Sequence, residues 1–153
     1  SAKLHELNRG NGMKKIILGL LVCLALCVTQ NASAQMFTMG GSNGSVVNTA
    51  TAYNTLEVSG SYETVSIQTV ITKVSGTVAG TVTLQGSNDG VNYETFDTNY
   101  VSTATVTFTP TNVTTNSKIW LMNRNPYLFF RIKYVGTGTM SATMTSYLVA
   151  KSK

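Results

Sequence analysis

The segment Leu128–Val135, with the sequence LFFRIKYV, decides the fold more clearly than any other part of the chain. Apolar and polar side chains alternate along it with a period of about two residues. Leu128, Phe130, Ile132 and Tyr134 share one side, and Phe129, Arg131 and Lys133 share the other. Because successive side chains of a β-strand point to opposite faces, the segment predicts a strand with one buried face.

Shorter segments with the same period lie on both sides of this strand. They cover residues 63–74, 82–85, 104–109, 118–122 and 139–150. Between Ile67 and Val70 the apolar positions change side, which predicts a bulge or a strand buried on both faces. Asp89-Gly90 follows the 82–85 segment and predicts a tight hairpin, because Gly accepts the positive φ that such turns require.

These segments make about seven or eight short strands, and no helical period follows the N-terminal region. Two sheets that each bury one apolar face against the other are the most economical arrangement for such strands. The sequence therefore predicts an all-β fold, a single antiparallel β-sandwich of jelly-roll or discoidin-like type, with an open-ended barrel as the alternative. The composition agrees, since only 11% of the residues are charged and β-branched Thr is frequent.

The N-terminal region has the pattern of an export signal. A basic Lys14-Lys15 pair precedes an apolar run over residues 16–28, and Ala32-Ser33-Ala34 supplies the small residues that signal peptidase requires. The run is shorter than the roughly 20 residues of a transmembrane helix. We therefore expect cleavage after Ala34 and a secreted, cell-surface or virion location, without stable membrane insertion of the mature protein.

Four segments follow from this pattern: residues 1–12 as an upstream extension, 13–34 as the signal helix, 35–54 as an N-terminal arm and 55–153 as the sandwich domain. The arm is rich in Gly, Ser and Asn, so we expect it to be flexible or to form a first edge strand. Lipidation of Cys27 is the alternative fate of the leader. It is disfavoured because Leu26, the preceding residue, is larger than lipoprotein processing prefers.

The segment after Ala34 lacks the residues of common catalytic sites. His5, Cys23 and Cys27 all precede it, so it offers no His- or Cys-based nucleophile, no zinc site of the usual kind and no disulfide. A carboxylate-pair hydrolase is the least favoured hypothesis. It would have to use Glu57, Glu63, Asp89, Glu94 or Asp97. We expect a protein that is not an enzyme and that needs no cofactor and no metal.

The charge of this segment also limits its partners. It contains seven Lys and Arg and five Asp and Glu, which gives a formal charge of +2. Nucleic-acid-binding domains usually carry a clustered and strongly basic patch, so nucleic acid is not an expected partner. Six of the seven cations lie within residues 118–153, and we interpret them as solvated charges on strand faces.

The candidate ligand-binding residues are Asn88, Asp89, Asn92, Tyr93 and Trp120. The first four surround the predicted hairpin and would place amide and carboxylate groups beside an aromatic ring, as a carbohydrate site does. The competing interpretation is that these polar residues only form the turn and that Tyr93 packs across the hairpin. Trp120 lies on the opposite side of its segment from Ile119 and Leu121, so it is either an exposed platform or a core residue.

A second set of candidates follows the Asn125-Pro126 turn. Tyr127, Phe129 and Arg131 are expected at a subunit interface, because Phe129 shares its side of the strand with two cations and is therefore expected to be exposed. This interpretation favours a homo-oligomer or a larger protein assembly.

Two resemblances add to these patterns. The segment Val82–Tyr93 (VTLQGSNDGVNY) and the closing strand Phe130–Tyr134 (FRIKY) resemble discoidin-like domains of the coagulation factor 5/8 type C family. That resemblance implies a β-sandwich and carbohydrate binding. The wider stretch from Val65 to Leu148 more closely resembles small β-sandwich structural proteins of tailed phages and prophages of Bacteroidota-type hosts. Its motifs are Thr77–Thr81, Lys118–Trp120, Asn125–Tyr127 and Gly138–Ala142.

The leading functional hypothesis is a non-enzymatic, exported protein that decorates or assembles a cell-surface or virion structure. It depends on the missing catalytic residues, on the N-terminal arm and on Thr-rich strands that could pair at their edges. The alternative is a carbohydrate-binding adhesion module of discoidin-like type, with a surface glycan as its partner. An exposed Trp120 beside the hairpin would favour the alternative, and a buried Trp120 with an extended arm would favour assembly.

The export pattern predicts the N-terminus of the secreted protein. Mass spectrometry of protein collected outside a bacterial host should find Gln35 as the first residue, either free or cyclised to pyroglutamate. Protein that still begins at Met13 would contradict cleavage after Ala34.

Overall fold

A strict alternation of inward and outward side chains along β9 (Phe129–Gly136) and β10 (Met140–Lys151) sets the architecture. In β9 the inward side chains of Phe130, Ile132 and Tyr134 have no exposed surface. The structure is a computed structural model that describes residues 36–40, 44–58, 62–103 and 105–151. Within these ranges the regular structure is almost entirely β-strand, with one short 3-10 helix, η1 (Thr98–Tyr100).

Sheet A is built around β10 and has five strands. On one side β10 pairs with β4, which in turn pairs with β8. On the other side β1 and β2 pair with successive parts of β10, and every pairing is antiparallel. The bounds are β1 (Met36–Gly40), β2 (Gly44–Val47), β4 (Thr64–Gly76) and β8 (Thr115–Asn123).

Sheet B is built around β9 and also has five strands. β9 pairs with β3 on one side and with β5 on the other, and the outer side of β5 pairs with β6 and β7. These pairings are antiparallel as well. The bounds are β3 (Thr51–Glu57), β5 (Gly80–Ser87), β6 (Glu94–Thr95) and β7 (Thr107–Phe108).

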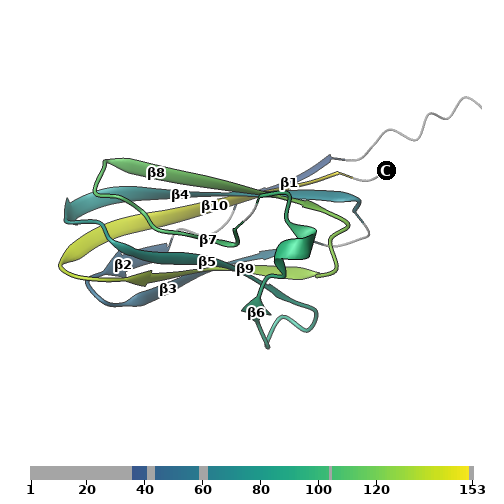
Figure 1. Cartoon of the computed structure of the whole chain (residues 1–153), viewed down its shortest axis with the longest axis horizontal. Coiled ribbons are helices and arrows are strands. Elements are labelled where there is room, and N and C mark those ends of the chain that lie inside the picture. Colours follow the sequence, from purple (N-terminus) through teal and green to yellow (C-terminus); the bar gives the residue numbers. More distant parts are fainter. Residues whose placement is uncertain (1–35, 41–43, 59–61, 104, 152–153) are drawn as a thin grey trace, which may run out of the picture. The chain divides into compact units, whose positions relative to one another are not determined.

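The chain crosses between the two sheets at most of the connections between described strands. β2, β4, β8 and β10 lie in sheet A, while β3, β5 and β9, which alternate with them along the chain, lie in sheet B. The resulting strand orders, β2-β10-β4-β8 and β3-β9-β5-β6, are those of a jelly roll. Figure 1 shows the two layers, with β8, β4 and β10 in one and β5, β9 and β3 in the other. The predicted antiparallel β-sandwich is confirmed.

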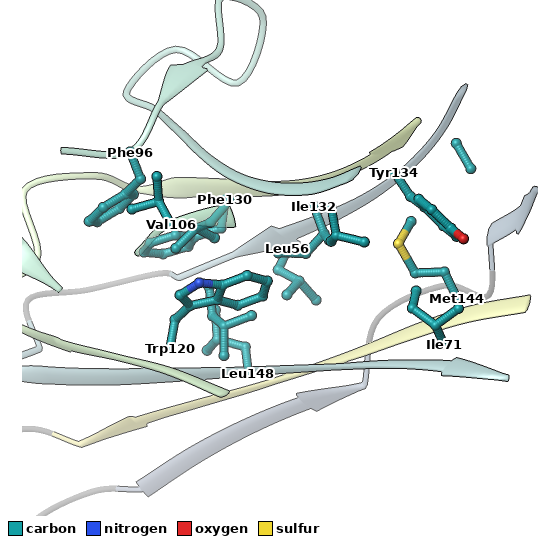
Figure 2. Close-up of a cluster of buried hydrophobic side chains, with 14 of the residues drawn as sticks. Leu56, Ile71, Phe96, Val106, Trp120, Phe130, Ile132, Tyr134, Met144 and Leu148 are labelled. Carbon is teal, nitrogen blue, oxygen red and sulfur yellow. The ribbon is translucent and has the colours of Figure 1, made fainter. Parts of the chain in front are cut away.

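The inner faces of the two sheets form one apolar core. Trp120 on β8 is fully buried, and its indole Nε1–H donates a hydrogen bond to the Thr105 carbonyl oxygen at 3.1 Å. Its ring centroid lies 6.0 Å from that of Phe108 on β7, so these two rings join the sheets. Figure 2 shows Trp120 pointing into the space between the sheets, among side chains such as Leu148 and Phe130.

A polar network is buried inside this core. The Asn54 amide nitrogen on β3 donates to the Met144 carbonyl oxygen at 3.0 Å and to the Ser146 hydroxyl at 3.2 Å. The Ser146 hydroxyl in turn lies 3.0 Å from that of Thr69 on β4. Asn54, Ser146 and Thr69 have no exposed surface, so these hydrogen bonds offset part of the cost of burying their polar groups, while the Asn54 side-chain oxygen has no partner among the described residues.

The structure shows no irregularity between Ile67 and Val70, where the sequence predicted a bulge or a strand buried on both faces. Inward and outward residues alternate without interruption along this part of β4, and Thr69 occupies the inward position between Ile67 and Ile71. A hydroxyl that has a partner in the core can replace an apolar side chain, so the strand needs no bulge there. The register of β4 with β10 shifts later, opposite Ser141 and Ala142.

The structure also corrects the boundary of the sandwich. Residues 35–54 were expected to form an arm, flexible or paired as a first edge strand; the structure agrees with the second alternative, since β1, β2 and the start of β3 lie within this range and are paired in the two sheets. Val46 is fully buried although its segment is rich in Gly, Ser and Asn. The sandwich therefore begins well before Thr55, because β1 and β2 pair with the edge of β10 that β4 does not occupy.

The expected upstream extension and signal helix lie outside the described residues, so their assignment stays a prediction. Among the residues that the structure describes, no helix is long and apolar enough to cross a membrane.

The core position of Trp120 can be tested by mutation. Trp120→Ala should lower the free energy of unfolding by about 3–5 kcal/mol, because it leaves a large cavity between the sheets. Ile119→Ala on the same strand is the control and should have a much smaller effect, since Ile119 is 51% exposed. Urea denaturation followed by circular dichroism measures both, and equal effects would contradict the assignment of Trp120 to the core.

Candidate functional site

Most of the polar and aromatic candidates meet on the outer face of sheet B. On β9 the outward side chains are Phe129, Arg131 and Lys133, because the inward positions between them hold the core residues. In the register of the sheet, Arg131 lies between Thr55 of β3 and Gln85 of β5. It therefore occupies the middle of this face.

Arg131 is held by three neighbours from different parts of the chain. Its guanidinium carbon lies 4.6 Å from the ring centroid of Tyr53 on β3 and 4.0 Å from that of Tyr93, which follows the hairpin after β5. Its Nε–H donates to the Gln85 side-chain oxygen at 2.9 Å. The guanidinium is thus stacked by two aromatic rings and fixed by one hydrogen bond, so its orientation is well defined.

The predicted hairpin is present, and Asp89 organises it. The Asp89 carboxylate accepts hydrogen bonds from the backbone N–H groups of Val91 and Asn92 at 2.9 and 2.8 Å, and from the Asn92 amide at 2.7 Å. It also accepts from the Ser87 hydroxyl at 2.8 Å. Gly90 adopts a φ of +71°, as the Asp-Gly prediction requires. The pKa of Asp89 lies well below its usual range, chiefly because the two backbone N–H groups stabilise the carboxylate.

These bonds change the interpretation of the hairpin residues. Both carboxylate oxygens of Asp89 and the amide nitrogen of Asn92 are engaged within the turn. The competing interpretation, that the polar residues form the turn, therefore accounts for Asp89 and Asn92. Asn88 is exposed at the tip, and Tyr93 contacts Arg131.

The structure corrects the proposed role of Trp120. A stacking platform must be exposed, whereas Trp120 is fully buried and lies in the core next to Phe108. Ile119 and Leu121, on the opposite side of β8, are exposed, at 51% and 38%. Trp120 is therefore not part of the ligand surface.

The expected interface residues separate into two groups. Tyr127 packs at the margin of the core, with its ring centroid 4.9 Å from that of Phe96 and its ring directly over Gly86. Burial raises its pKa, and the nearby Asp97 carboxylate adds to the effect. Phe129 and Arg131 lie on the outer face of sheet B. The hairpin packs beside Phe129, whose ring lies 3.4 Å from the position that a Cβ atom on Gly90 would occupy. A role of these residues in subunit contact stays a prediction.

Two residues of the Arg131 cluster were not found by sequence analysis. Tyr53 lies in the range that was assigned to the arm, and Gln85 was noted only as an outward position of its strand. The alternation of exposed and buried positions along Thr51–Glu57 is regular in the structure, but Asn54 at an inward position hides it in the sequence.

Metal binding finds no support in the described part of the chain. No group of three or more His, Cys, Asp and Glu side chains lies close enough together there to hold an ion.

Comparisons with known proteins show the fold. No family model and no curated protein matches the chain. Among solved structures, the PBSX exported protein XepA matches with a TM-score of 0.52 and 10% identity over 76% of this chain and 37% of its own. The xylan-binding CBM22-1 domain of Paenibacillus barcinonensis Xyn10C matches with a TM-score of 0.44 and 10% identity, over 80% of this chain and 84% of the domain.

A Bacillus endospore appendage protein, from a family of disulfide-linked pili, matches with a TM-score of 0.41 and 12% identity over 80% of this chain and 92% of its own. At 10% identity the likeness to XepA, with its TM-score of 0.52, supports the fold and carries no statement about activity. The resemblance to phage structural proteins and to discoidin-like domains is thus supported at the level of the fold, and the narrower relationships stay predictions.

The pKa of Asp89 predicts an acid-dependent contribution to stability. The carboxylate is bonded in the folded state and solvated in the unfolded state, where its pKa is about 3.9. Its contribution is therefore complete above that pH and is lost as the pH falls toward the lower folded pKa. Thermal melts of the wild type and of Asp89→Asn should differ at pH 7, and the difference should narrow progressively as the pH falls below about 4. A difference that does not change with pH would contradict this role.

Proposed function

We propose that this protein is a non-enzymatic, exported structural protein that assembles through the outer face of sheet A. The observation that carries the proposal is the set of exposed apolar side chains on this uncharged face. Tyr147, Ile119 and Leu121 are 44%, 51% and 38% exposed. Isolated exposed apolar residues are ordinary on protein surfaces, but several that share one uncharged face favour an interaction site.

The register of sheet A places these residues in two pairs on one face. Ile119 and Leu121 are outward neighbours on β8, and Tyr147 and Val149 are outward neighbours on β10. Gln68 and Ser66 of β4 lie between the two pairs, which are therefore about 10 Å apart. The face is thus uncharged, with apolar side chains on both sides of a polar strand.

The partner that best fits this face is a second copy of the same chain. The outward positions of β4, β8 and β10 carry uncharged side chains throughout, apart from Lys151 at one end. In a two-fold symmetric contact each patch faces itself, so any charge near the axis would meet an identical charge. An uncharged apolar face avoids this repulsion, and two such faces can pack as the sheets of a sandwich do.

The arm gives this proposal no support. The expectation was that residues 35–54 reach a neighbouring subunit, but the described part of this range pairs with β10 and β9 of its own chain. Two features were expected to favour assembly, a buried Trp120 and an extended arm. The structure has the first and not the second.

Recognition of a surface glycan is a second candidate function, on the opposite face of the molecule. The specific observation in its favour is the stack of Tyr53, Arg131 and Tyr93 on the outer face of sheet B. It combines aromatic rings with a fixed hydrogen-bond donor on a sheet whose other outward residues include several Thr hydroxyls, and these are the groups that carbohydrate sites use.

The assembly proposal predicts a defined mass in solution. The protein from Gln35 onward, which contains every described strand, should be dimeric by light scattering at micromolar concentration. Ile119→Lys places two like charges near the symmetry axis and should shift the protein to a monomer, with an increase of about tenfold or more in the dissociation constant.

Thr81→Lys is the matched control, because it adds the same charge at an exposed position on the outer face of sheet B. It should leave the dimer intact. A wild-type protein that is monomeric at all concentrations, or a dimer that both variants weaken equally, would overturn the assembly through sheet A.

A further inference from the structure

The outer face of sheet B contains a cation, Arg131, that has no anionic partner among the described residues. Arg131 makes one hydrogen bond, from Nε–H to Gln85, and its two terminal amino groups have no acceptor among the described residues. Glu57 is an exposed carboxylate on the same face, opposite Phe129 and diagonal to Arg131, but no ion pair joins a carboxylate to Arg131 in the described part of the chain. The nearest acidic residue of the hairpin, Asp89, uses both of its oxygens within the turn.

The surroundings prepare this guanidinium for a ligand. Tyr53 and Tyr93 stack on it at 4.6 and 4.0 Å, so its rotamer is fixed before any ligand arrives. A fixed planar fork loses little side-chain entropy on binding and can donate two parallel hydrogen bonds to a carboxylate. Tyr53 remains 47% exposed, so part of its ring is available to a second contact.

A second cation lies on the same face. Lys133 is two residues from Arg131 on β9, and its side chain points outward like that of Arg131. Outward residues two apart on one strand are about 7 Å apart, so the two charges form a short row. In the register, Lys133 is flanked by Tyr53 and by Thr83, which add a ring and a hydroxyl.

These groups favour an acidic saccharide over other anions. A neutral sugar would not require two unpaired cations, whereas two cations are too few for the phosphates of a nucleic acid. We propose that the outer face of sheet B binds carboxylate-bearing polysaccharides, with Arg131 as the bidentate carboxylate ligand, Lys133 as a second cation and Tyr53 in contact with a sugar ring. This inference rests on the second candidate function, glycan recognition, and adds the class of the glycan.

The test compares two polymers that differ only in charge. Polygalacturonate carries a carboxylate on every sugar, and its methyl ester has the same backbone without that charge. Affinity electrophoresis or calorimetry with the full chain should show binding to polygalacturonate. The dissociation constant for the methyl ester should be higher by about tenfold or more. Dextran sulfate serves as a third polymer, with charge but no carboxylate.

Three variants locate the site. Arg131→Gln should weaken binding to polygalacturonate about tenfold, and Lys133→Gln should weaken it a few-fold, about as one partly solvated charge would. Lys118→Gln is the matched control, because it removes one charge from β8 in sheet A. It should leave the affinity unchanged. Thermal melts would show whether Arg131→Gln destabilises the hairpin. In that case Lys133→Gln still tests the site.

The possible outcomes distinguish a failure of the carboxylate selectivity from a failure of glycan recognition itself. Equal binding of the acid and of the methyl ester would overturn the selectivity for carboxylates and leave glycan recognition in place. Binding to neither polymer would overturn both. Equal losses from Arg131→Gln and Lys118→Gln, or tighter binding of dextran sulfate than of polygalacturonate, would show a general attraction of anions and would also overturn the proposed site.

Discussion

The packing of two sheets over a single apolar core is the constraint on which the rest of this structure depends. Each strand has a period of two residues, so burying one side of β9 or β10 commits the other side to the surface. Trp120 and Phe130 can lie inside only if Leu121 and Arg131 lie outside. The functional surfaces of the protein are therefore fixed by the same alternation that forms its core.

The two outer faces that result differ in their chemistry. The outer face of sheet A is uncharged over most of its area and carries exposed Ile119 and Tyr147, which suits contact with an identical face. The outer face of sheet B carries Arg131 and Lys133 among aromatic and hydroxyl groups, which suits an anionic ligand. A dimer formed through one face presents two copies of the other face, and such bivalency raises the overall affinity for a polymer.

The strands could be predicted from the sequence wherever apolar and polar residues alternate, as in Leu128–Val135. The prediction was incomplete where a polar residue is buried: the Asn54 amide nitrogen donates to Ser146 and to the Met144 backbone, the Thr69 hydroxyl bonds to Ser146, and only tertiary structure supplies those partners. Trp120 was left open because both sides of its segment are apolar, and a local pattern cannot tell which apolar side a second sheet will cover. The Arg131 cluster joins three elements that are distant in the sequence, so only Tyr93 and Arg131 were identified, and as members of separate sites.

Fluorescence of the single tryptophan tests the central claim most directly, because Trp120 reports which side of β8 faces the core. If the alternation is as described, the native protein should emit at short wavelength, acrylamide should hardly quench the emission, and both properties should change only when the protein unfolds. Emission at long wavelength with efficient quenching in the native state would place Trp120 in water. The inner and outer sides of β8 would then be reversed, and the uncharged apolar surface of sheet A would not exist.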